Sequence, residues 1–500
     1  MSESVPLLVH SSSVKRRCSP CHFLLIHSRE AVLVLFWDLI IGIAQYVGLS
    51  VMSDDLAHVR KIELGLAFTF IVAGYLGDFL ISRHKLILAG LYSLFLLVIP
   101  MLLVVSLQLV PSNDIILLIY IIFSYAVFVI VGAVRVNVLP FNIDQLIGSS
   151  SDELTAIIHW HNAGPLLGPF IITNANLLAT EYRRIVWLGS IIVFVTAILV
   201  SHSLFNHYLN TTPVNTVNPV KLIVRVLCYA RKHKYPENRS ALTYWEEEAP
   251  SRLDLGKDKY GGPFTEEEVE DVKTVLRLLP MVIIFGLSGS LYNLYSISMD
   301  ATAYGCNDLN TGMQSYFRKY IPSMLKRIGI GLTLIFIVNV LYVILAILGN
   351  YHFGETFHCL TIFDKKLSAR PQSWQYFDEI IGAIVWYSND VVSVEFILAQ
   401  CPKSMRGTVI ALWFSLFRLR SQFQFMLIFW PFLQYMSPDI PLGRGFYFFL
   451  TLSVLSLLVL VLFIYLAKRY KLRVREVEIN IHQIAENYTI RYIEQDEEHR

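Results

Sequence analysis

Residues 376–413, YFDEIIGAIVWYSNDVVSVEFILAQCPKSMRGTVIALW, decide the fold class of this chain. They place the carboxylate of Glu395 deep inside a hydrophobic helix and follow it with the short basic elbow CPKSMRG, residues 401–407. An ionised side chain in the hydrocarbon of a membrane costs roughly 2.5–3.5 kcal/mol on insertion scales, so it normally faces a partner or a water-filled path. Glu395 is therefore the first candidate for a functional residue.

The composition indicates a membrane protein. Hydrophobic residues make up 55% of the chain and charged residues only 16%, with a mean hydropathy of +0.53, whereas soluble domains carry about 25% charged residues. A helix of about 20 apolar residues crosses a bilayer, and no alternation typical of a barrel is present. The sequence therefore predicts an all-α polytopic membrane protein with eleven spans, at about 31–53, 62–82, 86–108, 114–138, 154–178, 184–205, 275–297, 329–349, 376–400, 407–432 and 445–467.

The loop charges conflict with an odd number of spans. Short loops rich in Lys and Arg stay in the cytosol, and this rule places both termini there, on the basic residues 15–17 and 468–475. Eleven crossings cannot join two ends on one side. The conflict falls at residues 301–317, which are too polar and too short to span. Twelve helices are expected, with helix eight missing: either the protein has lost it, or the sequence is an incomplete version of a twelve-helix protein.

The order of the spans predicts two helical bundles joined by a cytosolic linker. The predicted parts are a cytosolic N-terminal tail (1–30), an N-terminal six-helix bundle (31–205), a linker with an amphipathic helix (206–274), a C-terminal bundle (275–467) and a cytosolic C-terminal tail (468–500). Within the linker, residues 219–234 are basic and amphipathic, which fits either a helix on the anionic leaflet or a solvated helix. Thr265 and Glu268 form a predicted capping box at the start of the next helix.

Several motifs resemble the proton-coupled oligopeptide transporter family of the major facilitator superfamily. EFILAQCPKSMRGTVIALWF (395–414) resembles its tenth-helix signature, FNIDQL (141–146) its motif after helix four, and GYLGDFLISRHK (74–85) its second-to-third loop. The sequence of residues 252–280, RLDLGKDKYGGPFTEEEVEDVKTVLRLLP, is most similar to that of animal peptide/histidine transporters. The resemblance implies a transporter with two bundles and the transport path between them.

The resemblance also implies a substrate site. Arg135 matches a helix-four position facing the peptide carboxylate, Asn162 matches a helix-five residue bonded to the peptide backbone, and Glu395 is implied in binding the amino terminus or in coupling. Independently of the family, a buried Arg in one half and a buried Glu in the other suit the two ends of a zwitterion. The implied function is proton-linked secondary transport of di- or tripeptides, or of histidine, by alternating access between the two bundles. The implied partners are the substrate, protons and the lipid bilayer.

Proton coupling is uncertain on the residues alone. The stretch LIIGIAQYVG (39–48), where the family carries a charged cluster, has no charge, and Asp38 lies one helical position away. Glu395 and His159 are the remaining coupling candidates, because a histidine can titrate near lysosomal pH. A proton-independent facilitator and a non-transporting membrane scaffold derived from a transporter are the alternatives.

The other candidate residues form a gate and a sorting signal. The predicted cytosolic gate consists of Asp78, Arg83, Lys85, Asp144 and Gln145. At the N-terminus, the predicted acidic dileucine signal consists of Glu3, Leu7 and Leu8, which would bind a sorting adaptor and direct the protein to lysosomal or endosomal membranes in preference to the plasma membrane.

The sequence carries no signature of several other function classes. It shows no nucleophile with a base, no metal cluster and no phosphate loop, so we expect no enzyme activity, no cofactor and no metal site. The net charge is only +2, with basic residues at helix ends, so no nucleic-acid partner is expected.

Overall fold

The computed structural model describes most of the helical part of the chain. The described residues are 26, 28–52, 56–107, 114–146, 151–161, 180–209, 218–233, 251–292, 323–352, 381–382, 384–423, 431 and 446–470. Predictions about Asn162, the sorting signal at residues 3–8 and the missing helix at 301–317 fall outside these ranges.

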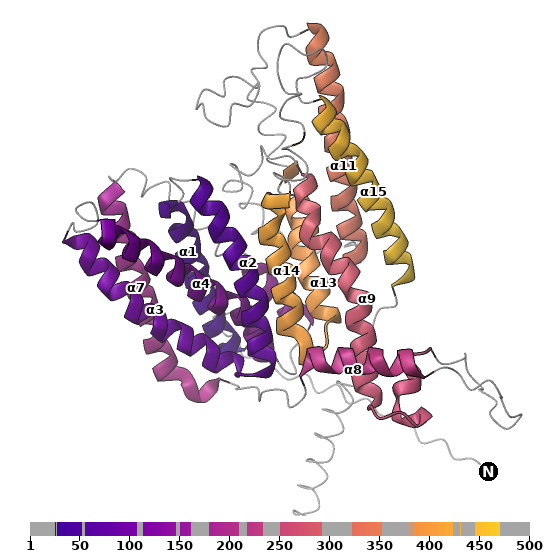
Figure 1. Cartoon of the computed structure of the whole chain (residues 1–500), viewed down its shortest axis with the longest axis horizontal. Coiled ribbons are helices and arrows are strands. Elements are labelled where there is room, and N and C mark those ends of the chain that lie inside the picture. The colour runs from indigo at the N-terminus through magenta and orange to yellow at the C-terminus, as the bar shows by residue number, and fades with distance from the viewer. Residues whose placement is uncertain are drawn as a thin grey trace, which may run out of the picture.

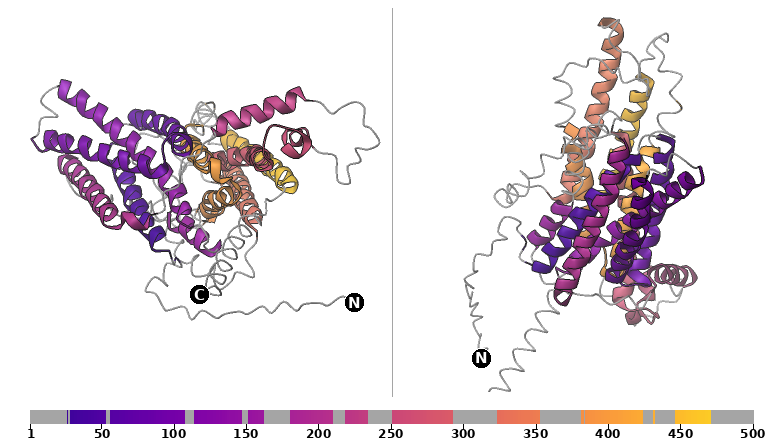
Figure 2. Two further views of the ribbon diagram at one scale, coloured as in Figure 1. Left: turned by 90° about the horizontal axis from the view of Figure 1, so that it is seen from below. Right: turned by 90° about the vertical axis from the view of Figure 1, so that its left-hand side faces the viewer.

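The described helices form two groups that lie side by side (Figure 1). The N-terminal group contains α1 (Arg29–Met52), α2 (Leu56–Phe79), α3 (Arg83–Ser106), α4 (Asp114–Asp144), α5 (Ser151–His161) and α7 (Thr180–Phe205). The C-terminal group contains α9 (Glu266–Ser288), α11 (Met324–His352), α13 (Val392–Gln400), α14 (Arg406–Phe423) and α15 (Phe446–Arg469). Helices α2 and α14 form the main contact between the groups, and α5 adds contacts to α13. The views in Figure 2 show the same division.

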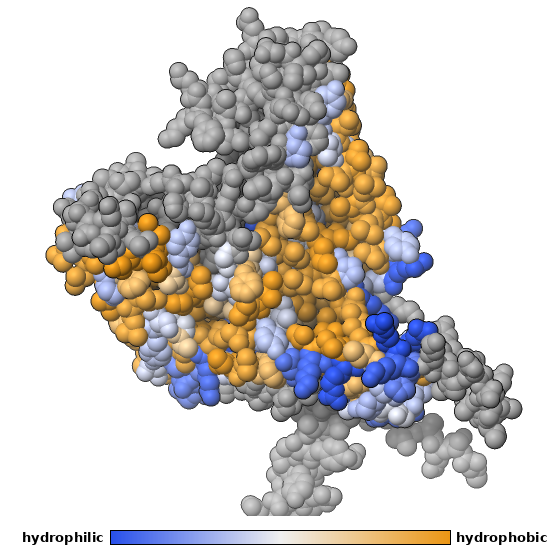
Figure 3. Space-filling model, in the orientation of Figure 1, coloured by the Kyte–Doolittle hydropathy of each residue, from blue (hydrophilic) through white to orange (hydrophobic). Residues whose placement is uncertain are grey.

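The prediction of an all-α membrane protein is confirmed. Six described segments are long and apolar enough to cross a bilayer, at Arg83–Ser106, Ile119–Asp144, Ile185–Tyr208, Glu266–Leu291, Met324–Ile344 and Phe446–Arg469. Apolar side chains cover much of the described surface on the face that Figure 3 shows. Examples of strongly exposed apolar residues are Phe68, Leu96 and Val193, which are 65–72% exposed. An apolar surface of this extent marks a region that contacts lipid. The predicted total of eleven spans stays a prediction, because several of them fall partly outside the described residues.

The described part of the linker folds against the C-terminal group. Helix α8 (Pro219–Lys232) begins at Asn218, whose side chain accepts a hydrogen bond from the Lys221 backbone N–H at 3.1 Å, and it contacts α9. Figure 1 shows α8 lying across the lower end of the helices. The predicted capping box at the start of α9 is confirmed: Thr265 Oγ1 accepts from the Glu268 N–H at 3.3 Å, and Glu268 Oε2 accepts from the Thr265 N–H at 3.0 Å.

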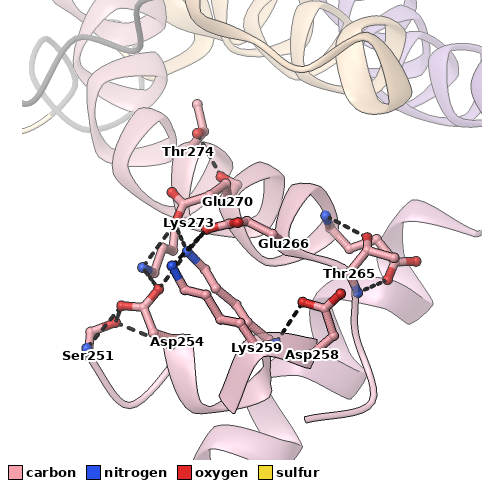
Figure 4. Close-up of polar contacts among 11 residues, drawn as sticks. Ser251, Asp254, Asp258, Lys259, Thr265, Glu266, Glu270, Lys273 and Thr274 are labelled. Atoms are coloured by element: carbon pink, nitrogen blue, oxygen red, sulfur yellow. Dashed lines mark hydrogen bonds and ion pairs between the residues drawn. The ribbon is translucent and has the colours of Figure 1, made fainter. Parts of the chain in front are cut away.

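A cluster of charges holds residues 254–260 onto the first turns of α9 (Figure 4). Lys257 Nζ lies 2.6 Å from Glu270 Oε1, 3.1 Å from Glu266 Oε1 and 3.0 Å from Asp254 Oδ1, and Lys273 contacts both Asp254 and Glu270. Burial alone would lower the pKa of Lys257, but its hydrogen bonds to carboxylates outweigh burial and raise that pKa. This charged network lies outside the apolar core. It attaches residues 254–260 of the linker to α9, so these residues belong to the C-terminal group.

Candidate functional site

Glu395 lies in a buried cluster between the two groups of helices. Its side chain, on α13, is 4% exposed, and its Oε1 is 3.2 Å from Nη2 of Arg327 on α11. The same guanidinium donates from Nη1 to the hydroxyl of Tyr387 at 3.2 Å. A buried carboxylate needs such a compensating charge, because desolvation of an isolated ion costs several kcal/mol. Arg327 and Glu395 therefore form one electrostatic unit within the C-terminal group.

The N-terminal group contributes α5 to this cluster. The side chain of Thr155 lies beside the Glu395 carboxylate, and the ring of His159 lies 5.7 Å from the ring of Tyr387. Thr155 and His159 are four residues apart, so they share one face of α5. We call Thr155, His159, Arg327, Tyr387 and Glu395 the Glu395 cluster. It brings the two predicted coupling candidates, Glu395 and His159, to the same interface.

The Glu395 cluster lies toward one end of the bundle. Helix α13 ends at Gln400, five residues after Glu395, which is about 8 Å along a helix with a rise of 1.5 Å per residue. Arg327 is likewise in the first turn of α11. The loop charges of the sequence predict that this end faces the cytosol.

A second network joins the two groups at the same end. Asp78, at the end of α2, accepts hydrogen bonds from the backbone N–H groups of Gly407 at 3.1 Å and Thr408 at 2.6 Å, and from the Thr408 hydroxyl at 2.8 Å. Two of these donors are among the unpaired N–H groups that begin α14, where the helix dipole favours a negative charge. A carboxylate of one group thus caps a helix of the other.

Arginines balance the charge of this network. Arg83 contacts both Asp78 and Asp144 within the N-terminal group, and Arg406 of α14 reaches Asp144 at 3.2 Å from the other group. We call Asp78, Arg83, Asp144 and Arg406 the gate quartet. All four are buried, with no more than 8% of the side chain exposed. Two positive and two negative charges compensate each other, which is the condition for keeping ions buried.

Two glycines allow the helices of the gate to approach closely. A Cβ built on Gly74 would come within 2.4 Å of the Ala411 Cβ and 2.7 Å of the Gly407 carbonyl oxygen. A Cβ on Gly407 would lie 2.5 Å from Asp78 Oδ1. Small residues at such crossings let backbones pack at short range. The capping of α14 by Asp78 depends on this spacing.

A second buried ion pair lies within the C-terminal group. The helix preceding α13 widens into a π-helical turn, labelled η9 (Tyr387–Val391), a feature that is frequent at functional sites. Asp390 in this turn accepts from Arg420 Nη1 at 3.0 Å and 3.2 Å, and the guanidinium stacks on Phe417 at 4.0 Å. The turn therefore directs Tyr387 to Arg327 and Asp390 to Arg420.

The structure places the other predicted residues in different ways. Arg135 is half-buried on α4, nine residues before the gate residue Asp144. Gln145 is buried and donates to the Phe141 carbonyl at 3.3 Å. Lys85 is exposed on α3 and, among the described contacts, takes no part in the gate, because residues two apart point to different faces of a helix. Within the described residues, no group of three or more His, Cys, Asp or Glu could hold a metal ion.

Comparison with known proteins identifies the fold. No protein-family model matches the sequence. The structure is similar to that of an auto-inhibited POT family peptide transporter, with 13% identity, a TM-score of 0.57 and coverage of 90% of this chain and 98% of that chain. It is also similar to the POT family transporter PepTSo, with 13% identity, a TM-score of 0.55 and coverage of 89% and 99%. The chain has the major facilitator superfamily fold.

A third similar structure is a POT family transporter in complex with a thioalcohol-conjugated peptide, with 12% identity, a TM-score of 0.53 and coverage of 88% and 96%. In the major facilitator fold, the two bundles enclose the transport path and their contacts close it at either face. The gate quartet and the Glu395 cluster both contain contacts between the two groups of helices. This chain is a multi-pass membrane protein with the fold of these structures.

Proposed function

We propose that this protein is a secondary transporter of the major facilitator type that carries short peptides. The observation that carries the proposal is a set of buried charges at the contact between the two bundles, in the Glu395 cluster and the gate quartet. Buried ions are costly, and a scaffold that never opened would need none of them between its halves. The similarity to solved peptide transporters supports the choice of substrate.

We propose that di- or tripeptides, or histidine, bind between Arg135 and the C-terminal bundle. Arg135 supplies a guanidinium that can bind a carboxylate with two parallel hydrogen bonds, and Asn162 is proposed to bond the backbone of the substrate. Glu395 would either bind the amino terminus or couple transport to protons. Because Glu395 already pairs with Arg327 near the cytosolic end, coupling is the role that its surroundings favour.

In this proposal the gate quartet controls the cytosolic face. Opening would separate Asp78 from Gly407 and Thr408, and Arg406 from Asp144. Arg83 would stay with Asp78 and Asp144, because all three belong to the N-terminal bundle. Each carboxylate would therefore keep a positive partner while water replaces the lost contacts. A gate built in this way can open and close without leaving an unpaired buried ion.

The test is uptake of a radiolabelled dipeptide into proteoliposomes containing the purified protein. We expect saturable uptake that excess unlabelled dipeptide suppresses. Arg135→Ala is expected to abolish it, because the substrate carboxylate would lose its cation, and Arg135→Lys should retain part of it. Equal uptake in both variants would remove Arg135 from the site. No dipeptide or histidine uptake by the unmutated protein would favour the scaffold alternative.

We further propose residence in lysosomal or endosomal membranes, on the basis of Glu3, Leu7 and Leu8. Replacing both leucines by alanine is expected to move a tagged protein from lysosomes to the plasma membrane, because an adaptor would no longer bind the signal. Colocalisation by fluorescence microscopy measures this change. An unchanged lysosomal pattern would contradict the role of the signal.

A further inference from the structure

Asp38 and His161 form a buried acid–imidazole pair inside the N-terminal bundle. Asp38 Oδ2, on α1, contacts His161 Nδ1, in the last turn of α5. Each side chain is only 3% exposed. Among the residues that the structure describes, neither Asp38 Oδ1 nor His161 Nε2 has a hydrogen-bond partner. The two groups thus depend on each other for compensation, since the described contacts supply no other charge to either of them.

The pair lies at the middle of the bundle and beside the opposite bundle. His161 is ten residues after the first residue of α5, and Asp38 is nine after the first residue of α1, distances of about 15 Å and 14 Å along a helix. These are close to half of the hydrocarbon thickness of about 30 Å. The His161 ring also packs edge-on against Phe414 of α14, with centroids 6.1 Å apart. Separation of the bundles would therefore change the surroundings of the pair.

Apart from Arg135 and Arg418, the other charged groups described on the neighbouring elements are engaged elsewhere or lie at a different level. Asp78, Asp144 and Arg406 belong to the gate quartet, and Arg420 pairs with Asp390. His159 lies against Tyr387, and His202 contacts His84. Glu153 lies two turns before His161 on α5, and Arg29 and Glu30 begin α1. Arg135 lies nine residues before the end of α4, at a similar depth, and Arg418 lies one turn after Phe414 on α14.

The charge of the pair depends on one proton. With a neutral imidazole, the ionised pair carries a buried charge of −1, which is costly to desolvate. With a protonated imidazole, the two charges compensate each other and the pair is neutral overall. Histidine is the side chain that ordinarily changes charge between pH 5 and pH 8. A proton on this pair would therefore stabilise the arrangement in which the bundles are closed around it.

We propose that Asp38 and His161 together form a proton-binding site of the transporter, in addition to the coupling role proposed for Glu395. This proposal rests on the proposed function. The Asp38–His161 pair is a titratable group next to the neutral stretch at residues 39–48. Its two residues are 123 positions apart in the chain. One proton would bind His161 from the acidic side and form the neutral pair, and the same proton would leave to the cytosol after the bundles open there. The remaining charge of −1 would then be hydrated, which favours the open arrangement.

The first test separates proton-driven accumulation from exchange. His161→Gln and Asp38→Asn are expected to lose accumulation of a labelled dipeptide driven by an inward proton gradient, while counterflow between dipeptide pools persists, since exchange needs no net proton movement. His202→Gln is the matched control, a histidine near Trp37 that lies outside the pair. Full gradient-driven accumulation by His161→Gln would overturn the proposal.

The second test does not require transport. In detergent, the unfolding temperature of the unmutated protein is expected to rise more between pH 8 and pH 5.5 than that of His161→Gln, because only the unmutated protein gains the compensating proton. If this difference appears while the unmutated protein shows no counterflow, the proposed function fails and the proton site stands. If both proteins respond equally to pH, the proton site is contradicted whatever is transported.

Discussion

Arg327→Leu is expected to destabilise the protein by about 3–5 kcal/mol, the cost of leaving one partner of a buried ion pair without the other. Glu395, at 4% exposure, would lose the positive charge beside it, and the hydroxyl of Tyr387 would lose its contact with the guanidinium. The double variant Arg327→Leu, Glu395→Leu is expected to recover most of this stability, because no charge remains to be desolvated. Denaturant unfolding of the purified protein in detergent measures both changes.

The adjacent variant Lys326→Leu provides the control. Lys326 is exposed on α11, and substitutions of such residues usually change stability by less than about 0.5 kcal/mol. Uptake measurements on the same variants separate stability from function. The double variant is expected to be stable and unable to transport. If it transports normally, the pair serves folding only and Glu395 has no part in the transport cycle.

Asp78→Asn is expected to shift the protein toward the state that is open to the cytosol. Asp78 accepts bonds from Gly407, Thr408 and Arg83, and hydrogen bonds to charged groups contribute about 1.5–3 kcal/mol each. Loss of one such bond would lower the ratio of closed to open protein by at least about tenfold. Spin labels on cysteines placed at the exposed positions Lys85 and Lys403 would report a longer distance between the bundles.

Asp271→Asn is the matched control for this experiment. Asp271 also accepts a bond at the same end, from the Ser404 hydroxyl at 3.0 Å, but both residues belong to the C-terminal bundle. Its substitution should leave the distance between the bundles unchanged. If Asp78→Asn and Asp271→Asn give the same distance distribution, the bond from Asp78 to the start of α14 does not hold the gate closed.

Local sequence patterns predicted the features that depend on neighbouring residues. The apolar runs predicted membrane helices because hydropathy over 20 residues is a property of one segment. The capping box at Thr265 was predicted for the same reason, since both of its partners lie within four residues. Glu395 stood out because a charge inside an apolar run is costly wherever the helix packs.

The partners of these residues could not be predicted, because they come from distant segments. Arg327 is 68 positions from Glu395, and no local pattern in the sequence connects the two. Arg420 and its partner Asp390 were missed, although a second acid within the same apolar run as Glu395 was a usable signal. Asp38 was noted only as a neighbour of the expected cluster, since nothing in the sequence connects it to His161.

The folded part of the linker limits how far the two bundles can swing apart. Its charged network fastens residues 254–260 to α9, and α8 contacts α9 while Asn218 bonds the Tyr75 hydroxyl of α2 at 2.5 Å. The covalent connection that can extend between the bundles is therefore only the nine peptide bonds from Leu209 to Asn218, rather than all of residues 206–274. Such a connection reaches at most about 30 Å when fully extended, and shortening it would reduce the separation that the two bundles can reach without changing any residue proposed to bind substrate.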